Sequence, residues 1–197
     1  MSTSKTQKPS KQLNLISIAD GETSYGPQGQ RIITVASNEL CGSEHMSAGL
    51  VVMPPLKVAR VHMHYVHESI LFFTEGWFAT LLGPELRPIF HGPGDVLFIP
   101  ENIIHVGINL SDTHNAVLLE VRSESDFHDD IIVQTHLEAK VEKIAVDLQK
   151  KFAAGELPLP SNWEKRGFGP YQFVEEEQRT PHHAASARSK TKTTVEA

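Results

Sequence analysis

Short apolar segments that recur every 8–12 residues are the feature that most constrains the fold of this chain. They occupy residues 31–37, 46–53, 58–64, 70–82, 87–91, 96–99, 103–109 and 116–122. Turn-forming residues separate them, for example Gly92, Pro93 and Gly94. Runs of β-branched and aromatic residues with this spacing are typical of strands in a sandwich or barrel. The sequence therefore predicts an all-β fold.

One helix is expected after the strands. Apolar residues there fall at positions i, i+4, i+7, i+11 and i+15, which places them on one face of a helix. Gly155 and Pro158 end this helix. We expect its apolar stripe to pack on the β domain or on a partner subunit. The stripe consists of Leu137, Val141, Ile144, Leu148 and Phe152.

Both ends of the chain have compositions that favour disorder. Residues 1–12 are almost free of apolar side chains, and residues 175–197 are acidic and then small and polar. We expect residues 13–135 to form the β-barrel. Residues 136–174 would hold the helix and a segment that wraps back onto the domain through Trp163, Phe168, Tyr171 and Phe173.

Charge and composition exclude several functions. The formal net charge of −6 argues against nucleic-acid binding. No apolar run reaches the ~18 residues of a membrane span, and the polar N-terminus lacks the apolar region of a secretory signal. A single cysteine, Cys41, excludes an intrachain disulfide and a Cys-based zinc cluster. We therefore expect a cytoplasmic protein that binds neither nucleic acid nor membranes.

Histidine is the residue type that carries a chemical signal. Among 11 histidines, His62 and His64 lie two positions apart on an expected strand, so their side chains share one face. His105 lies on another expected strand, and His67 and Glu68 follow the first pair. Imidazoles gathered in this way could bind one metal ion. By contrast, we expect His91, beside Gly92, to be a turn histidine.

Two motifs in order resemble the conserved motifs of the cupin superfamily. Gly94, Pro100, His105 and Asn109 have the spacing of the second cupin motif, with Asn102 where the family has glycine. Asparagine also tolerates left-handed backbone. The first motif resembles His62-Met63-His64, followed by Glu68 and then by residues 70–76, which end in glycine. The resemblance covers roughly residues 46–122.

This resemblance implies a cupin jelly-roll β-barrel that holds a metal ion inside. The family's ligands correspond to His62, His64 and His105, with Glu68 as the carboxylate. Two positions depart from the pattern. Leu56 stands where the family has a glycine, and counting back seven positions from Gly76 gives Ser69 and not a glutamate.

Three possibilities for a fourth ligand follow from this departure. A slip of one residue along a regular strand turns a side chain to the other face, but a bulge could turn Glu68 inward again. Alternatively, His67 could replace it, or the site could have three histidines only. We also consider Glu68 as a catalytic, proton-handling group.

The leading functional hypothesis is a non-haem Fe(II) dioxygenase that acts on a small aromatic or dicarbonyl substrate. An open coordination position and apolar walls would suit this chemistry. An isomerase, lyase or polyketide cyclase with Zn or Ni is the alternative, Mn and Cu are further candidate metals, and a non-enzymatic small-ligand-binding cupin is the third hypothesis. We expect no other cofactor, and we expect a homodimer in which the helix at 137–152 covers a sheet edge. The wall residues would be Leu71, Phe73, Val96, Phe98, Val117 and Leu119.

Overall fold

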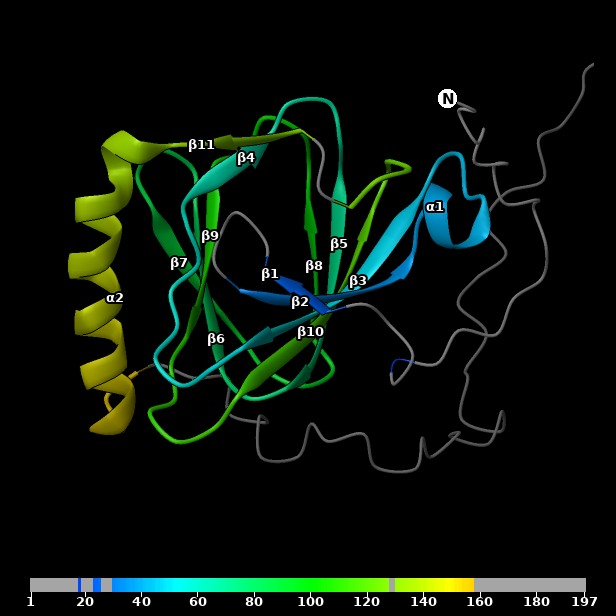
Figure 1. The fold of residues 1–197 in the computed structure, drawn as a ribbon. Coiled ribbons are helices and arrows are strands. Elements are labelled where there is room, and N and C mark those ends of the chain that lie inside the picture. Colours follow the sequence, from blue (N-terminus) through cyan, green and yellow to red (C-terminus); the bar gives the residue numbers. More distant parts are fainter. Residues whose placement is uncertain (1–17, 19–22, 26–29, 128–129, 158–197) are drawn as a thin grey trace, which may run out of the picture.

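The computed structural model describes residues 18, 23–25, 30–127 and 130–157, and these residues form two antiparallel β-sheets and a C-terminal helix (Figure 1). The expectations for residues 1–12, 175–197 and the aromatic segment after the helix lie outside the described residues. One sheet holds six strands and the other five, and among the described residues no strand belongs to both.

The six-stranded sheet has the order β1-β2-β3-β10-β5-β8. Buried and half-buried residues alternate along β3 and β10, so one face of the sheet points into the protein. The inner face supplies most of the main core, including Phe73 and Leu118. The strands are β1 Thr23–Tyr25, β2 Arg31–Ala36, β3 Ser47–Met53, β10 Ala116–Arg122, β5 Ser69–Glu75 and β8 Val96–Ile99; the short helix α1, Asn38–Cys41, follows β2.

The five-stranded sheet has the order β11-β4-β9-β6-β7 and is covered on both faces. Phe78 points inward and contacts Phe73 of the opposite sheet, with ring centroids 4.8 Å apart. Residues of alternate parity, such as Val106 and Ile108, point outward and pack against the C-terminal helix. The strands are β11 Ile131–Val133, β4 His62–His64, β9 His105–Asn109, β6 Phe78–Leu82 and β7 Arg87–His91.

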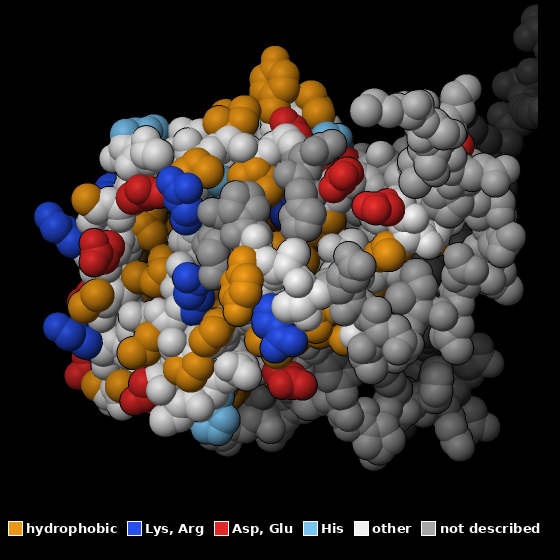
Figure 2. Space-filling model, in the orientation of Figure 1, with side chains coloured by type: hydrophobic (Ala, Val, Ile, Leu, Met, Phe, Trp, Pro, Cys, Tyr) orange, Lys and Arg blue, Asp and Glu red, His pale blue; other side chains and the backbone are white. Residues whose placement is uncertain are grey.

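Helix α2, Glu138–Ala153, follows the 3-10 turn Thr135–Leu137 and stands beside the five-stranded sheet (Figure 1). Its buried side chains, Val141, Ala145 and Leu148, lie on the expected stripe or next to it. The stripe therefore packs on the chain's own β domain. The opposite side of the helix carries both acidic and basic side chains (Figure 2). Among the described residues, neither α2 nor any other helix is long and apolar enough to cross a membrane.

Left-handed backbone occurs where the cupin motifs require glycine. Asn102 has φ 61°, as expected from its tolerance of this region, and its N–H donates to the carbonyl of His64 at 2.7 Å. Leu56, which stands where the cupin family has a glycine, has φ 58°. Gly76 has φ 76°, and a Cβ there would lie 2.5 Å from the carbonyl oxygen of Asn115. Glycine is therefore required at position 76.

Two expectations about strands are wrong. Residues 70–82 form two strands, because Gly76 and Trp77 turn the chain from one sheet into the other. Val96 and Phe98 do not line the interior: they are 62% and 52% exposed, on the outer face of β8. Val117 and Leu119, two further expected wall residues, are half-buried and lie on the face of β10 opposite to its buried residues. Leu71 and Phe73 are buried in the core, as expected for wall residues.

Candidate metal centre

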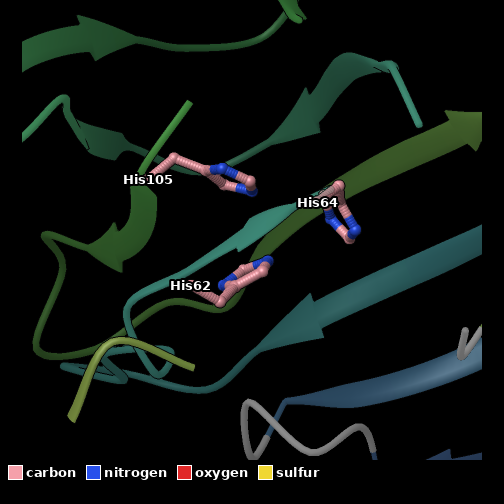
Figure 3. Close-up of side chains that lie close together, drawn as sticks. All are labelled: His62, His64 and His105. Carbon is pink, nitrogen blue, oxygen red and sulfur yellow. The ribbon is translucent and has the colours of Figure 1, made fainter. Parts of the chain in front are cut away.

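Three histidine side chains converge inside the protein (Figure 3). His62 and His64 both point inward from β4, because residues two apart on a strand share a face. His105 begins β9 and is the strand partner of His62. The three residues offer ring nitrogens that all lie within 4.8 Å of one another, and each residue is buried. The described residues contain no other group of this kind.

Two of the rings are oriented by backbone hydrogen bonds. The Nδ1 atom of His62 lies 2.9 Å from the carbonyl of Arg60, and that of His105 lies 2.9 Å from the carbonyl of Ile103. A carbonyl only accepts, so Nδ1 carries the proton and Nε2 keeps its lone pair. Fixing the tautomer in this way is typical of metal-binding histidines.

His64 supplies a further sign that the site binds something. Both of its ring nitrogens are buried and have no hydrogen-bond partner among the described residues. Buried polar atoms are nearly always paired, because an unpaired one costs about 1–3 kcal/mol. A metal ion coordinated by one of these nitrogens would remove part of this cost. The donor set thus fits a divalent transition metal such as Zn, Ni or Fe.

Burial keeps the three imidazoles neutral. Desolvation is the largest cause that lowers the pKa of His62 well below its ordinary value, and the electrostatic effect of the adjacent His105 lowers it further. Desolvation and the charge of Arg122 lower the pKa of His64 to about 4. Desolvation also lowers the pKa of His105, although its hydrogen bond to Ile103 and the charge of Glu120 oppose the shift. Neutral imidazole is the form that binds a metal.

Neither of the two candidates for a fourth ligand lies in this group. Glu68 is exposed immediately before β5, where its N–H donates to the Ser123 hydroxyl, and the structure does not bring its carboxylate to the histidines. His67 turns toward Asp130 and Glu124, with Nδ1 3.0 and 3.1 Å from their carboxylates. Of the three possibilities from the sequence, the described arrangement matches a site with three histidines. The assignment of Glu68 as a ligand or catalytic group stays a prediction.

The inner face of the six-stranded sheet carries polar residues that the sequence reasoning missed. Arg122 pairs in register with Ser47 on one side and Ser69 on the other, and all three are at least 99% buried. Glu120 lies two residues earlier on the same face of β10. The hydroxyls of Ser47 and Ser69 have no hydrogen-bond partner among the described residues.

Glu120 is a carboxylate whose charge reaches the histidines. Burial raises its pKa, but the charge and the hydrogen bond of Arg122 act in the opposite direction and outweigh burial, so the pKa is lowered. The sequence signal was the alternation of β10, in which Leu118, Glu120 and Arg122 share parity. Charged side chains are rarely buried unless they are paired, so a glutamate and an arginine on an otherwise apolar strand face indicate an ion pair inside the protein.

His91 is a core residue and not the turn residue that we expected. It ends β7, is 3% exposed, and its Nε2 lies 2.8 Å from the Thr80 hydroxyl. Its ring stacks on Phe73 with centroids 4.3 Å apart. Burial lowers its pKa to about 4. It does not belong to the histidine group.

Comparison with solved structures finds proteins of similar fold. The structure is similar to that of the polyketide cyclase RemF from Streptomyces resistomycificus, with a TM-score of 0.54 and 16% identity over 62% of this chain and 86% of that one. A sugar phosphate isomerase from a cupin superfamily, from Silicibacter pomeroyi, has a TM-score of 0.47 and 18% identity over 56% of this chain and 76% of that one. The DMSP lyase DddQ from Ruegeria pomeroyi has a TM-score of 0.48 and 20% identity over 59% and 62%.

No protein-family model matches the chain, and no curated protein matches its sequence. The shared feature is therefore the fold. With its two antiparallel sheets and the placement of both motifs, the chain has the cupin jelly-roll fold, followed by a C-terminal helix. The jelly-roll fold with a C-terminal helix that the sequence predicts is confirmed, but the two sheets share no strand among the described residues, so the barrel is not closed.

Proposed function

We propose that this protein is a metal-dependent enzyme whose His62, His64 and His105 hold a divalent transition-metal ion. We further propose that it isomerises, eliminates from or cyclises a small carbonyl substrate. The convergence of three buried, neutral imidazoles is the observation that carries the first proposal. When bound, the metal would supply Lewis acidity, which polarises a carbonyl oxygen.

The choice of a non-redox reaction rests on the residues beside the histidines. A three-histidine set without a carboxylate resembles catalytic zinc sites more than the two-histidine, one-carboxylate set of non-haem iron oxygenases. Ionised Glu120, with the hydroxyls of Ser47 and Ser69, gives the interior polar groups that can bind substrate and handle protons. The likeness of the fold to a polyketide cyclase is consistent with this choice.

A non-haem Fe(II) dioxygenase acting on a small aromatic or dicarbonyl substrate is the second candidate. It is supported by Leu71 and Phe73, which are buried on the same strand face as Ser69 and give the interior an apolar part. An aromatic ring could pack there beside the metal.

Metal content decides the first proposal. Elemental analysis of the purified chain should find about one divalent ion per chain, and the His62→Ala, His64→Ala and His105→Ala variants should each lose it. A folded wild-type chain that neither contains nor takes up a divalent ion would overturn the proposal.

Reaction class is decided on metal-loaded protein. The zinc- or nickel-loaded chain should catalyse the incorporation of solvent deuterium into small ketones or hydroxyketones, at the carbon next to the carbonyl. NMR of the substrate measures this incorporation. Oxygen uptake by the iron-loaded chain with diketones or phenols would instead support the dioxygenase. Small-ligand binding that survives His62→Ala, with neither activity, would make the protein a binding cupin.

A further inference from the structure

The histidine group lies at one end of the domain, next to two connections of the chain. His64 is the last residue of β4, and His105 is the first residue of β9. The two strands are antiparallel, with His62 opposite His105, so these strand ends lie at the same edge of the sheet. Residues 65–68 leave this edge toward β5, and residues 100–104 arrive there from β8. The two connections therefore border the histidine group.

The backbone places Ile103 beside the histidines. His62 pairs with His105, and continuing this antiparallel register by two residues sets position 103 opposite His64. Two hydrogen bonds agree with this placement. The N–H of Asn102 donates to the carbonyl of His64 at 2.7 Å, and Nδ1 of His105 donates to the carbonyl of Ile103 at 2.9 Å. Ile103 thus adjoins two of the three histidines.

The side chain of Ile103 is turned to the same side as the histidines. Ile103 has the parity of His105 along the chain, whereas Ile104 has the parity of Val106. Ile104 packs with Val106 in the cluster between the five-stranded sheet and α2, which lies on the other side of β9. Ile103 is 37% exposed. It is therefore an apolar group at the border of the site and not a core residue.

Two further apolar side chains project from the connection that follows His64. Tyr65 and Val66 are 60% and 59% exposed, and the N–H of Val66 donates to Oδ2 of Asp130 at 2.7 Å, which fixes the backbone there. Figure 2 shows hydrophobic side chains projecting from the end of the domain at which β4 leads to β5. We call Tyr65, Val66 and Ile103 the apolar rim.

An apolar rim beside a buried polar site has a physical use. Apolar side chains in water gain free energy when another apolar group covers them. Binding sites for small molecules combine such surfaces with a few polar groups that fix the orientation of the ligand. The histidines supply the polar part of this combination, and the rim supplies the apolar part at its border.

On these grounds, and resting on the metal site proposed above, we infer that the apolar rim binds an apolar group of the substrate. The substrate class is then a small molecule with two parts. An oxygen-bearing group reaches the histidine site, and an aromatic or branched aliphatic group packs on Tyr65, Val66 and Ile103. The rim sets specificity and takes no part in the chemical step.

The test compares two chelating probes on the Zn²⁺-loaded full-length chain. Acetohydroxamic acid and phenylacetohydroxamic acid carry the same metal-binding group, and the second also carries a phenyl ring. In calorimetric titrations the wild-type chain should bind the phenyl probe about tenfold more tightly, because the rim removes part of the ring from water.

Removal of the rim should abolish this preference. In the triple variant Tyr65→Ser, Val66→Ser and Ile103→Ser, the two probes should bind with affinities within about twofold of each other. The affinity for acetohydroxamic acid should stay at the wild-type value. Ile132→Ser is the matched control and should keep the full preference. Ile132 is 40% exposed but pairs with Met63, so it lies on the face of the sheet that is turned away from the histidines.

A second variant keeps the test decisive if the triple variant fails to fold. Tyr65→Ser with Val66→Ser changes only side chains that are mostly exposed, and such changes have little effect on stability. It should reduce the preference for the phenyl probe about threefold. Circular dichroism measures the folding of each variant.

The outcomes separate this inference from the proposed function. A wild-type chain that binds no Zn²⁺ overturns the metal site and, with it, the inference. A Zn²⁺-loaded chain that binds both probes equally, or folded rim variants that keep the wild-type preference, overturn the role of the rim alone. Rim variants that change the mass in sedimentation equilibrium but not the preference would make the rim an interface between copies of the chain.

Discussion

Single residues in the core set how stability depends on pH, and His91 shows this outside the metal site. Burial lowers its pKa to about 4, whereas an unfolded chain has the ordinary value near 6.5. Between these values the unfolded chain binds a proton that the folded chain does not. The free energy of unfolding therefore falls as pH drops from about 6.5 to 4, by about 3 kcal/mol from this residue.

The prediction is checked by urea unfolding at several pH values across this range. The His91→Gln variant should lose this part of the pH dependence, because an amide does not titrate, while His62, His64 and His105 contribute equally to both proteins. Equal slopes of stability against pH in wild type and variant would contradict the neutral, buried state of His91.

Gly76 illustrates a residue that the backbone dictates. We expect Gly76→Ala to lower the free energy of unfolding by about 3 kcal/mol, because left-handed strain is added to a clash with backbone atoms of Asn115 and Ala116. Gly94→Ala is the matched control: its φ is 88° but nothing lies within 4 Å of the added Cβ, so the loss should be about 1 kcal/mol. Equal losses in denaturant unfolding would rule out the clash.

At the scale of elements, α2 supports the strand that carries His105. Val106 and Ile108 on the outer face of β9 pack with Val141, Ala145 and Leu148 of the helix. The helix is also held by Gln149, whose side-chain amide donates to the carbonyls of Leu56 and Asn109 at 3.0 Å. Helix and histidine strand thus form one packed unit.

Leu148→Ala should therefore lower the free energy of unfolding by about 2–4 kcal/mol, through lost burial and the cavity that remains. Val146→Ala, at a residue that is 44% exposed on the same helix, should change it by less than about 0.5 kcal/mol. Urea unfolding of both variants measures the difference. A small effect at Leu148 would mean that α2 does not pack on the sheet.

Local patterns predicted elements whose signals lie within a few residues. The helix follows from its apolar period, and the left-handed turn at Asn102 follows from the motif. What local pattern could not give was the partner of each strand. The inward direction of Glu120 depends on β10 lying between β3 and β5. The residues that pair with β10 in these two strands lie 42 to 75 positions earlier in the chain. The outward direction of Phe98 likewise depends on which face of β8 meets the core.

At the scale of the whole molecule, the two sheets differ in how their outer faces are covered. Helix α2 covers the five-stranded sheet, whereas β8 and β5 of the other sheet present Val96, Phe98 and Ile70, which are 62%, 52% and 48% exposed. In register, Ile70 pairs with Phe98. Such exposed apolar groups on adjacent strands are typical of an interface.

The sheet edge next to this face indicates what covers it. Among the described residues, β8 pairs only with β5, so its other side offers free backbone N–H and C=O groups. An open edge strand is a template for another strand. A second copy of β8, placed antiparallel about a two-fold axis, would pair both edges and bring the two apolar faces together. The homodimer expected from the sequence thus remains our prediction, but through β8, because α2 packs on its own domain.

Phe98→Glu should convert this dimer into a monomer, since it places a charge in an apolar, self-facing surface. Ile132→Glu is the control, because Ile132 is 40% exposed but lies on β11 of the other sheet. Sedimentation equilibrium of the full-length chain measures the mass of each protein. A monomeric wild type at high concentration, or a Phe98→Glu variant that stays dimeric, would show that β8 is not the interface.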